Sequence, residues 1–210
     1  MPKIEPFENH YEKYEEWFNK NEFTYQSELN AVKELLPEKG KGIEIGVGSG
    51  RFAAPLGIKF GIDPSEKMLE IAKRRGIDVK IGVAENLPYE NESFDYALMV
   101  TTICFVDDIE QSFREAYRIL KKGGVIVIGF VDKDSKIGKE YQKIKDKSLF
   151  YGPATFFSVE EVESYLKEVG FKNFDYRQTI FNTLDKIKSV EPVKNGYGEG
   201  SFIVIRAEKL

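Results

Sequence analysis

A short apolar segment that ends in three alternating glycines constrains the fold of this chain more than any other feature. Residues 43–50 have the sequence Ile-Glu-Ile-Gly-Val-Gly-Ser-Gly, which puts glycine at positions 46, 48 and 50. A glycine has no Cβ, so its backbone can adopt a positive φ and bring its N–H group against a bound ligand. The pattern predicts a buried strand followed by a tight loop that approaches a ligand closely.

The spacing of these glycines argues against two common nucleotide sites. A dinucleotide site of the Gly-x-Gly-x-x-Gly type needs its third glycine where this chain has Arg51. A phosphate loop needs Lys followed by Ser or Thr after its last glycine, whereas Arg51 and Phe52 follow Gly50 here. The spacing therefore disfavours an NAD(P)-dependent oxidoreductase and a nucleoside triphosphate site.

Four segments of the chain resemble class I S-adenosylmethionine-dependent methyltransferases of the type 11 kind. The glycine loop resembles the first motif of that family, which passes beneath the amino-acid part of the cofactor. Residues 60–69 resemble its second strand, which ends in an acid, and the helix that follows. Residues 82–96 resemble the link between its third and fourth strands, and residues 118–124 resemble the approach to its fifth strand.

The resemblance implies that S-adenosylmethionine is the cofactor. Asp63 follows Glu44 by 19 residues, as expected for a βαβ unit in which an acid at the second strand's tip accepts hydrogen bonds from ribose hydroxyls. Family members commonly carry an acid just before Ala84, but this chain has Val83, which leaves adenine recognition to the backbone near Ala84 or to Glu85. The predicted cofactor-binding residues are Glu44, Gly46, Gly48, Gly50, Asp63, Pro64, Met68, Ala84, Glu85 and Thr101.

The order of apolar runs and helical patterns predicts an α/β, Rossmann-like fold. We expect a seven-stranded, mostly parallel sheet with helices on both faces and an antiparallel last strand, because too few residues precede that strand for a helical crossover. The expected strands lie near residues 42–46, 60–63, 79–83, 94–101, 124–131, 171–178 and 200–208. Helices are expected at 8–20, 25–36 and 109–120, and after Ser65 and Ser158.

Segments that the sheet does not need are predicted to cover its ligand-binding end. Residues 1–40 are expected to form an N-terminal helical lid over a core at 41–210, with further lid segments near 132–157 and 180–199. Ligands of open α/β sheets bind at the carboxyl ends of the strands. Among the aromatic residues of these segments, Tyr14, Trp17 and Tyr151 are predicted to contact the substrate, although core packing is an alternative for each.

The sequence does not identify a catalytic base. Relatives often carry a histidine after the fourth strand, where this chain has Thr-Thr-Ile-Cys-Phe at residues 101–105. Asp132 and Tyr151 are candidates for the base, and either could be structural. The implied reaction is methyl transfer to a small-molecule acceptor, whose reacting atom stays open. A non-catalytic protein that binds S-adenosylmethionine or S-adenosylhomocysteine is the alternative.

The composition and charge of the chain argue against several classes of partner. The 210 residues carry a formal net charge of −4, which disfavours a nucleic acid partner because phosphate binding normally leaves a basic footprint. No apolar run approaches the roughly 20 residues that cross a bilayer, so we expect a cytoplasmic protein without a membrane segment. Cys104 is the single cysteine, so no internal disulfide or metal site is predicted. The oligomeric state stays open.

Overall fold

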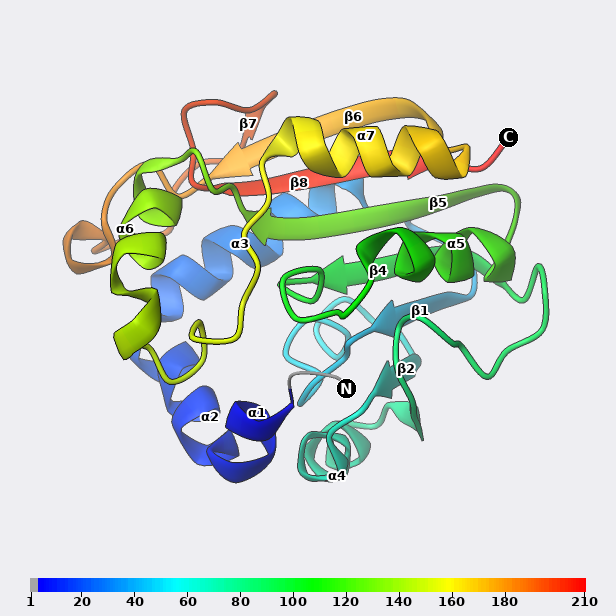
Figure 1. Ribbon diagram of the computed structural model, residues 1–210, viewed down its shortest axis with the longest axis horizontal. Helices are drawn as coiled ribbons and strands as arrows, with labels where there is room; N and C mark the ends of the chain where they lie inside the picture. The colour runs from blue at the N-terminus through cyan, green and yellow to red at the C-terminus, as the bar shows by residue number, and fades with distance from the viewer. Residues whose placement is uncertain (1–3) are drawn as a thin grey trace.

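The computed structural model describes residues 4–210, so the first three residues of the predicted lid lie outside the described residues. Within that range the chain forms one sheet with the strand order β3-β2-β1-β4-β5-β8-β6-β7 (Figure 1). The strands are β1 (Gly42–Ile45), β2 (Phe60–Asp63), β3 (Asp78–Ile81), β4 (Phe94–Val100), β5 (Leu120–Val131), β6 (Lys172–Thr179), β7 (Lys194–Asn195) and β8 (Phe202–Glu208).

The strand directions confirm the predicted fold class. The first five strands pair in parallel, while β8 inserts between β5 and β6 and is antiparallel to both. All seven expected strands are present, and the last expected strand is antiparallel as predicted. The two-residue β7, which pairs with β6 at the edge of the sheet, is an addition that the sequence pattern did not predict.

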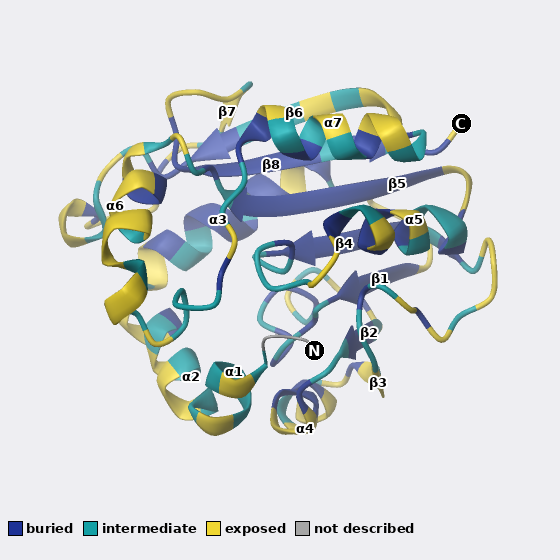
Figure 2. Cartoon of the chain, viewed as in Figure 1, coloured by how far each residue is buried: buried dark blue, intermediate teal, exposed yellow. Residues whose placement is uncertain are grey.

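Helices cover both faces of the sheet. They are α1 (Glu5–Asn9), α2 (Tyr11–Lys20), α3 (Glu22–Leu35), α4 (Glu66–Arg74), α5 (Ile109–Ile119), α6 (Lys136–Ile144) and α7 (Val159–Val169), with 3-10 turns η1 (Lys145–Lys147) and η2 (Leu184–Lys186). Along β5, Ile126 and Ile128 face α5 and α7, whereas Val125 and Val127 face α3 and α4. The central strands β1, β4, β5 and β8 are therefore largely buried on both sides, and the exposed residues lie on the outer surfaces of the helices, on the edge strands and in loops (Figure 2).

Local capping explains where the helices begin. Ser65 starts α4 by accepting a hydrogen bond from the Met68 N–H, at 3.3 Å. Ser158 starts α7 with the predicted capping box, in which Ser158 and Glu161 each accept from the other's backbone N–H. Such caps satisfy N–H groups that have no partner inside the helix, so they fix the helix starts next to the strand ends.

The N-terminal helices and α6 lie at the carboxyl end of the sheet. The arrowheads of β1, β4 and β5 point toward the side occupied by α1, α2 and α6 (Figure 1). The helix predicted at 8–20 is two helices, α1 and α2, which are separated at His10. Helix α3 packs against β5, β6 and β8, whereas α1 and α2 lie beside the strand ends (Figure 1). The lid boundary at residue 40 stays a prediction.

None of the helices in residues 4–210 has the length and apolar composition that a bilayer-spanning segment needs.

Candidate functional site

The glycine loop after β1 has the conformation that its sequence predicts. Gly46, Gly48 and Gly50 have φ values of 74°, 50° and 82°, in the left-handed region that favours glycine. A Cβ on Gly46 would lie 2.3 Å from Thr102 Cγ2, so this glycine is required by packing. A Cβ on Gly48 would meet nothing nearer than the Tyr14 hydroxyl at 3.7 Å. Only at Gly48 does the loop therefore leave open space beside its backbone.

A first cavity lies beside this loop and contains about 740 Å³ of empty volume, counted out to the solvent. The ends of β1, β2 and β4 and the segment after β3 supply its walls. Eight of the ten predicted cofactor-binding residues line it: Gly46, Gly48, Asp63, Pro64, Met68, Ala84, Glu85 and Thr101. Glu44 and Gly50 do not line the cavity. Gly50 instead packs against Ile77 and Ala72.

Asp63 is fixed at the tip of β2 by two backbone N–H groups. Its Oδ2 accepts from the Gly48 N–H at 2.8 Å, and its Oδ1 accepts from the Ser65 N–H at 2.9 Å. Burial raises the pKa of Asp63 to about 6, against the lowering effect of these two hydrogen bonds, and the Glu8 carboxylate adds to the rise. Each oxygen keeps a second lone pair, so Asp63 can still accept two hydrogen bonds from a ligand.

Glu44 lies within β1 and is only 2 % exposed. The Ala53 backbone N–H donates to its carboxylate, while Oε2 is buried and has no hydrogen-bond partner among the described residues. Burial holds the pKa of Glu44 well above its usual value. A buried, unpartnered oxygen of this kind costs free energy unless a ligand compensates it.

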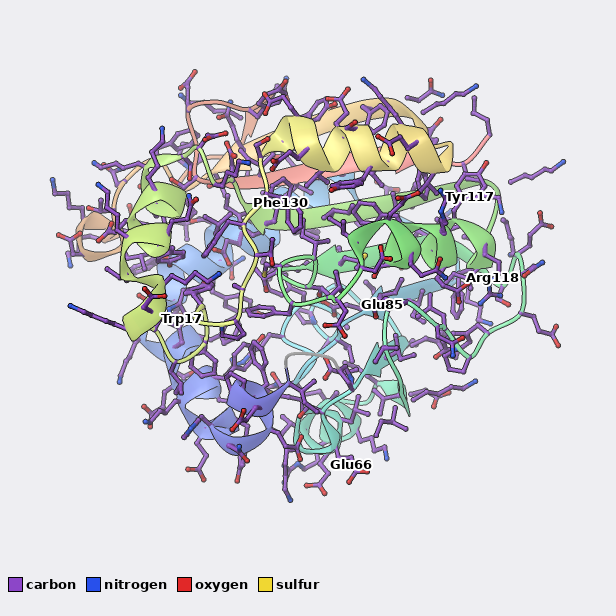
Figure 3. The ribbon with its side chains drawn as sticks, in the orientation of Figure 1. Trp17, Glu66, Glu85, Tyr117, Arg118 and Phe130 are labelled. Carbon is purple, nitrogen blue, oxygen red and sulfur yellow. The ribbon has the colours of Figure 1, made fainter. Side chains whose placement is uncertain are left out.

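The Glu85 carboxylate crosslinks two loops. Its Oε1 accepts from the backbone N–H groups of Asp107 and Asp108, at 2.7 and 3.2 Å, and its backbone carbonyl accepts from Gln111 Nε2 at 3.2 Å. These contacts hold the segment after β3 against the start of α5. Glu85 therefore lines the first cavity while its side chain holds the cavity wall together (Figure 3).

Two glutamates that sequence reasoning missed attach the N-terminal helices to the core. Glu8 of α1 accepts from the Ser65 hydroxyl at 2.5 Å. Glu15 of α2 pairs with Arg51 and Arg75, each at 2.6 Å, and accepts a hydrogen bond from Ser49. Burial acts to raise the pKa of Glu15, but the hydrogen bonds from Arg75, Ser49 and Arg51 outweigh it and lower the pKa. No local motif signals such pairs, because the partners are far apart in the chain.

A second cavity of about 840 Å³ adjoins the first. The two cavities share four lining residues: Phe7, Tyr14, Thr101 and Phe105. All three residues predicted to contact the substrate, Tyr14, Trp17 and Tyr151, line the second cavity, and Tyr14 lines both. Trp17 lies where α2 approaches α6, well away from Glu85 (Figure 3).

Aromatic rings form the shared wall and the far side of the second cavity. Phe7 contacts Phe105 and Tyr14 edge-on, with ring centroids 4.9 and 5.7 Å apart. On the far side, Tyr141 and Tyr151 stack at 4.4 Å with an interplanar angle of 25°. Burial raises the pKa of Tyr151 well above its usual value, so this phenol stays protonated at neutral pH.

Glu28 is the one acidic residue among the described residues that line the second cavity. It lies on α3, its side chain is 92 % buried, and no described residue makes a hydrogen bond or ion pair with it. Burial raises the pKa of Glu28 to about 8. Sequence reasoning missed it, although a signal was present: Glu28 shares a helix face with Thr24, Ala31 and Leu35, all of them buried.

Comparisons with known proteins identify the family. A family model described as a methyltransferase domain matches residues 43–128. A solved structure from Thermotoga maritima, described as an S-adenosylmethionine-dependent methyltransferase and possible histamine N-methyltransferase, is 56 % identical with a TM-score of 0.97. That match covers 99 % of this chain and all of the other. This chain belongs to the S-adenosylmethionine-dependent methyltransferase family.

Other relatives of this methyltransferase span several lineages. An uncharacterized protein of Methanocaldococcus jannaschii is 50 % identical over 97 % of this chain and 98 % of its own length. A demethylmenaquinone methyltransferase of Staphylococcus saprophyticus is 27 % identical over 70 % of this chain and 76 % of its own. As in the family, S-adenosylmethionine is the cofactor, and the first cavity suits it. Asp63 has acceptors free for a ribose diol, Gly48 leaves space at the backbone, and Met68 supplies an apolar wall.

The candidate bases of this methyltransferase differ in position. Tyr151 lines the second cavity, but its raised pKa makes it a poor base. Asp132 lines neither of the two cavities and accepts a hydrogen bond from the Asp134 N–H at 3.1 Å, which fits a role in the turn after β5. Glu28 is a buried carboxyl group that lines the second cavity and has no partner among the described residues.

Proposed function

We propose that this protein is an enzyme that transfers a methyl group from S-adenosylmethionine in the first cavity to a small-molecule acceptor in the second cavity. The observation that carries the proposal is the shared wall of the two cavities, at Tyr14 and Thr101. Methyl transfer requires the acceptor atom to lie in line with the bond that breaks, so the two ligands must meet at one boundary. The bound cofactor supplies an already activated methyl group.

The chain's own residues would bind the cofactor and the acceptor, orient them toward each other and exclude water from the reacting atoms. We propose that Asp63 accepts from the ribose hydroxyls, that Gly46, Gly48 and Thr101 contact the cofactor through backbone, and that Met68, Pro64 and Ala84 pack against its adenosine part. Glu44 and Gly50 are proposed to act indirectly, by supporting the glycine loop. The aromatic wall around Phe7 would keep water from the reacting atoms.

A small organic acceptor is favoured by the composition of the second cavity. Its walls are mostly aromatic, as is common in sites for small molecules. Helices α1 and α2, which Glu8 and Glu15 attach to the core, are proposed to form the lid. The Thermotoga relative is described as a possible histamine N-methyltransferase and the Staphylococcus relative as a demethylmenaquinone methyltransferase, and both descriptions refer to organic molecules rather than macromolecules.

The proposal is tested by supplying the purified protein with S-adenosylmethionine labelled in its methyl group and a panel of small amines, phenols, thiols and quinols, with histamine among them. Transfer of label to a member of the panel, and its loss in Asp63→Ala, would support the enzyme. Tight binding of the cofactor and its demethylated product, with no transfer to any panel member, would favour the binding-only alternative.

A further inference from the structure

The buried carboxyl group of Glu28 has no hydrogen-bond or ion-pair partner among residues 4–210. Glu28 lines the second cavity from α3, its side chain is 8 % exposed, and no described residue donates a hydrogen bond to it or pairs with it. A buried carboxylate is costly unless it is paired. Another buried acid, Glu191, has partners for both of its oxygens in the Phe181 N–H and the Asn182 amide. The partner of Glu28 is therefore expected to arrive with the ligand.

The other walls of the second cavity favour a positive charge in that ligand. No Lys, Arg or His is among the described residues that line it, so none of these lining residues supplies a positive charge. The rings of Trp17, Tyr141, Phe150 and Tyr151 line the same space, and aromatic faces attract organic cations. An anionic acceptor would meet Glu28 and ring faces without any group to pair with its charge.

We propose that the acceptor is an organic amine that binds as its ammonium ion, and that Glu28 is the residue that selects it. The proposal rests on the proposed function, because it concerns the substrate class of the same site. Glu28 is a specificity-determining residue in this proposal, and the atom that receives the methyl group is not assigned. The aromatic walls provide the remaining contact surface, which suits an amine that carries an apolar or aromatic group.

The protonation behaviour of Glu28 agrees with a ligand-borne partner. Burial raises the pKa of Glu28 to about 8, so without a ligand the group is largely protonated at neutral pH. An ammonium ion beside it favours the carboxylate, because an opposite charge stabilises the ionised form. Tyr141 and Tyr151 face the same space, and burial raises the pKa of each, so both phenols stay neutral. The carboxyl group can therefore be ionised when a cation is bound beside it and stay protonated when the cavity holds no cation.

The test is calorimetric binding to the full chain saturated with S-adenosylhomocysteine, using three matched probes. 2-Phenylethylamine carries the ammonium, 2-phenylethanol replaces it with a neutral hydroxyl, and phenylacetate replaces it with an anion. We expect the amine to bind at least tenfold more tightly than the alcohol, and phenylacetate to bind most weakly. Equal affinity for amine and alcohol, or no binding of the amine, would overturn the proposal.

Two variants separate recognition from folding. Glu28→Gln keeps the shape of the side chain, so it should bring amine affinity down to that of the alcohol while the affinity for S-adenosylhomocysteine stays unchanged. Glu22→Gln is the matched control, since Glu22 lies on the same helix but is exposed, and it should behave as the wild type. An amine preference that survives Glu28→Gln would also overturn the proposal.

The outcomes distinguish this proposal from the proposed function. If labelled methyl groups reach only neutral or anionic acceptors, the enzyme stands and the amine assignment fails. If the amine binds in a Glu28-dependent way but no amine, phenol, thiol or quinol is ever methylated, the recognition role stands and the proposed transfer fails.

Discussion

The first cavity is built around the glycine loop and an acid that backbone N–H groups hold, whereas the second is lined by side chains from several separate segments. In the first, Asp63 is held by the N–H groups of Gly48 and Ser65, and Gly46 and Gly48 line the cavity. In the second, α2, α3, α6 and the loop near residue 150 each contribute a side chain, such as Trp17, Glu28, Tyr141 and Tyr151. Backbone contacts survive most substitutions, while side-chain contacts can change one at a time.

This difference fits a fixed cofactor and an acceptor that varies between relatives. The Asp63 carboxylate has partners before any ligand binds, so its position is set by the fold. Glu28 has no partner in the part of the chain that the structure describes, so we expect its role to depend on what enters the cavity. The predictions below test whether the two cavities really separate in this way.

The largest expected effect is the loss of cofactor affinity in Asp63→Ala. Two hydrogen bonds to a charged acceptor contribute about 3 kcal/mol together, so we expect a roughly 100-fold weaker affinity for S-adenosylhomocysteine by calorimetry. Asp63→Asn keeps the shape of the side chain, so it should lose less affinity for S-adenosylhomocysteine than Asp63→Ala. Glu28→Gln is the control from the second cavity and should leave this affinity unchanged. A similar loss of affinity in Asp63→Ala and Glu28→Gln would mean that the two cavities do not act independently in cofactor binding.

A pair of glycine substitutions separates packing from ligand contact within the same loop. Gly46→Ala should lower the free energy of unfolding by about 3 kcal/mol, because its Cβ would overlap Thr102 and its φ is positive. Gly48→Ala should cost only about 1 kcal/mol, since its Cβ has space, but that Cβ enters the first cavity. In chemical denaturation, Gly46→Ala should lose more stability than Gly48→Ala. In cofactor titration, Gly48→Ala should lose more affinity relative to its loss of stability than Gly46→Ala does. If Gly46→Ala showed the larger relative loss in both measurements, the assignment of Gly46 to packing and of Gly48 to ligand contact would be contradicted.

The attachment of α2 is expected to show a moderate effect. Glu15→Gln leaves Arg51 and Arg75 without their shared carboxylate in a partly buried position, and should lower the free energy of unfolding by about 2 kcal/mol. Because the pKa of Glu15 is lowered in the folded protein, this contribution is present above pH 4.5 and is lost as the pH falls. Glu16→Gln, at an exposed neighbouring position, should change stability by less than about 0.5 kcal/mol. Equal effects would show that α2 is not anchored through Glu15.

The first cavity was largely predictable from sequence because its parts are local. The glycine loop, Asp63 and the segment around Ala84 each follow a strand directly, and the order of strands brings these turns to one edge of the sheet. What the pattern could not supply was the use of each side chain. The Glu85 carboxylate points to Asp107 and Asp108, a pairing that depends on how two loops meet in space.

The second cavity was only partly predictable because its residues come together through tertiary packing. Tyr14, Trp17 and Tyr151 were named from aromatic content alone, whereas Glu28 required attention to an acid on the buried face of a helix. Strand limits show the same limitation. Gly123 and Gly124 suggested that the fifth strand begins near residue 124, but pairing of Leu120 with Phe94 starts β5 earlier. Long-range pairing decides such limits, and a local pattern does not record it.

The smallest expected effect concerns pH and again contrasts the two acids. We expect ribose hydroxyls to donate to the ionised form of Asp63, whose pKa is raised to about 6, so cofactor binding below that pH should release the proton of Asp63. Affinity for S-adenosylhomocysteine should therefore be nearly constant from pH 7 to 8 and fall about tenfold between pH 7 and pH 5, in titrations at constant ionic strength. In Asp63→Asn the decline should disappear, while in Glu28→Gln it should persist. A decline with a midpoint near pH 8 that Glu28→Gln removes would instead mean that the acid of the second cavity controls the first, and the contrast between the two cavities would be lost.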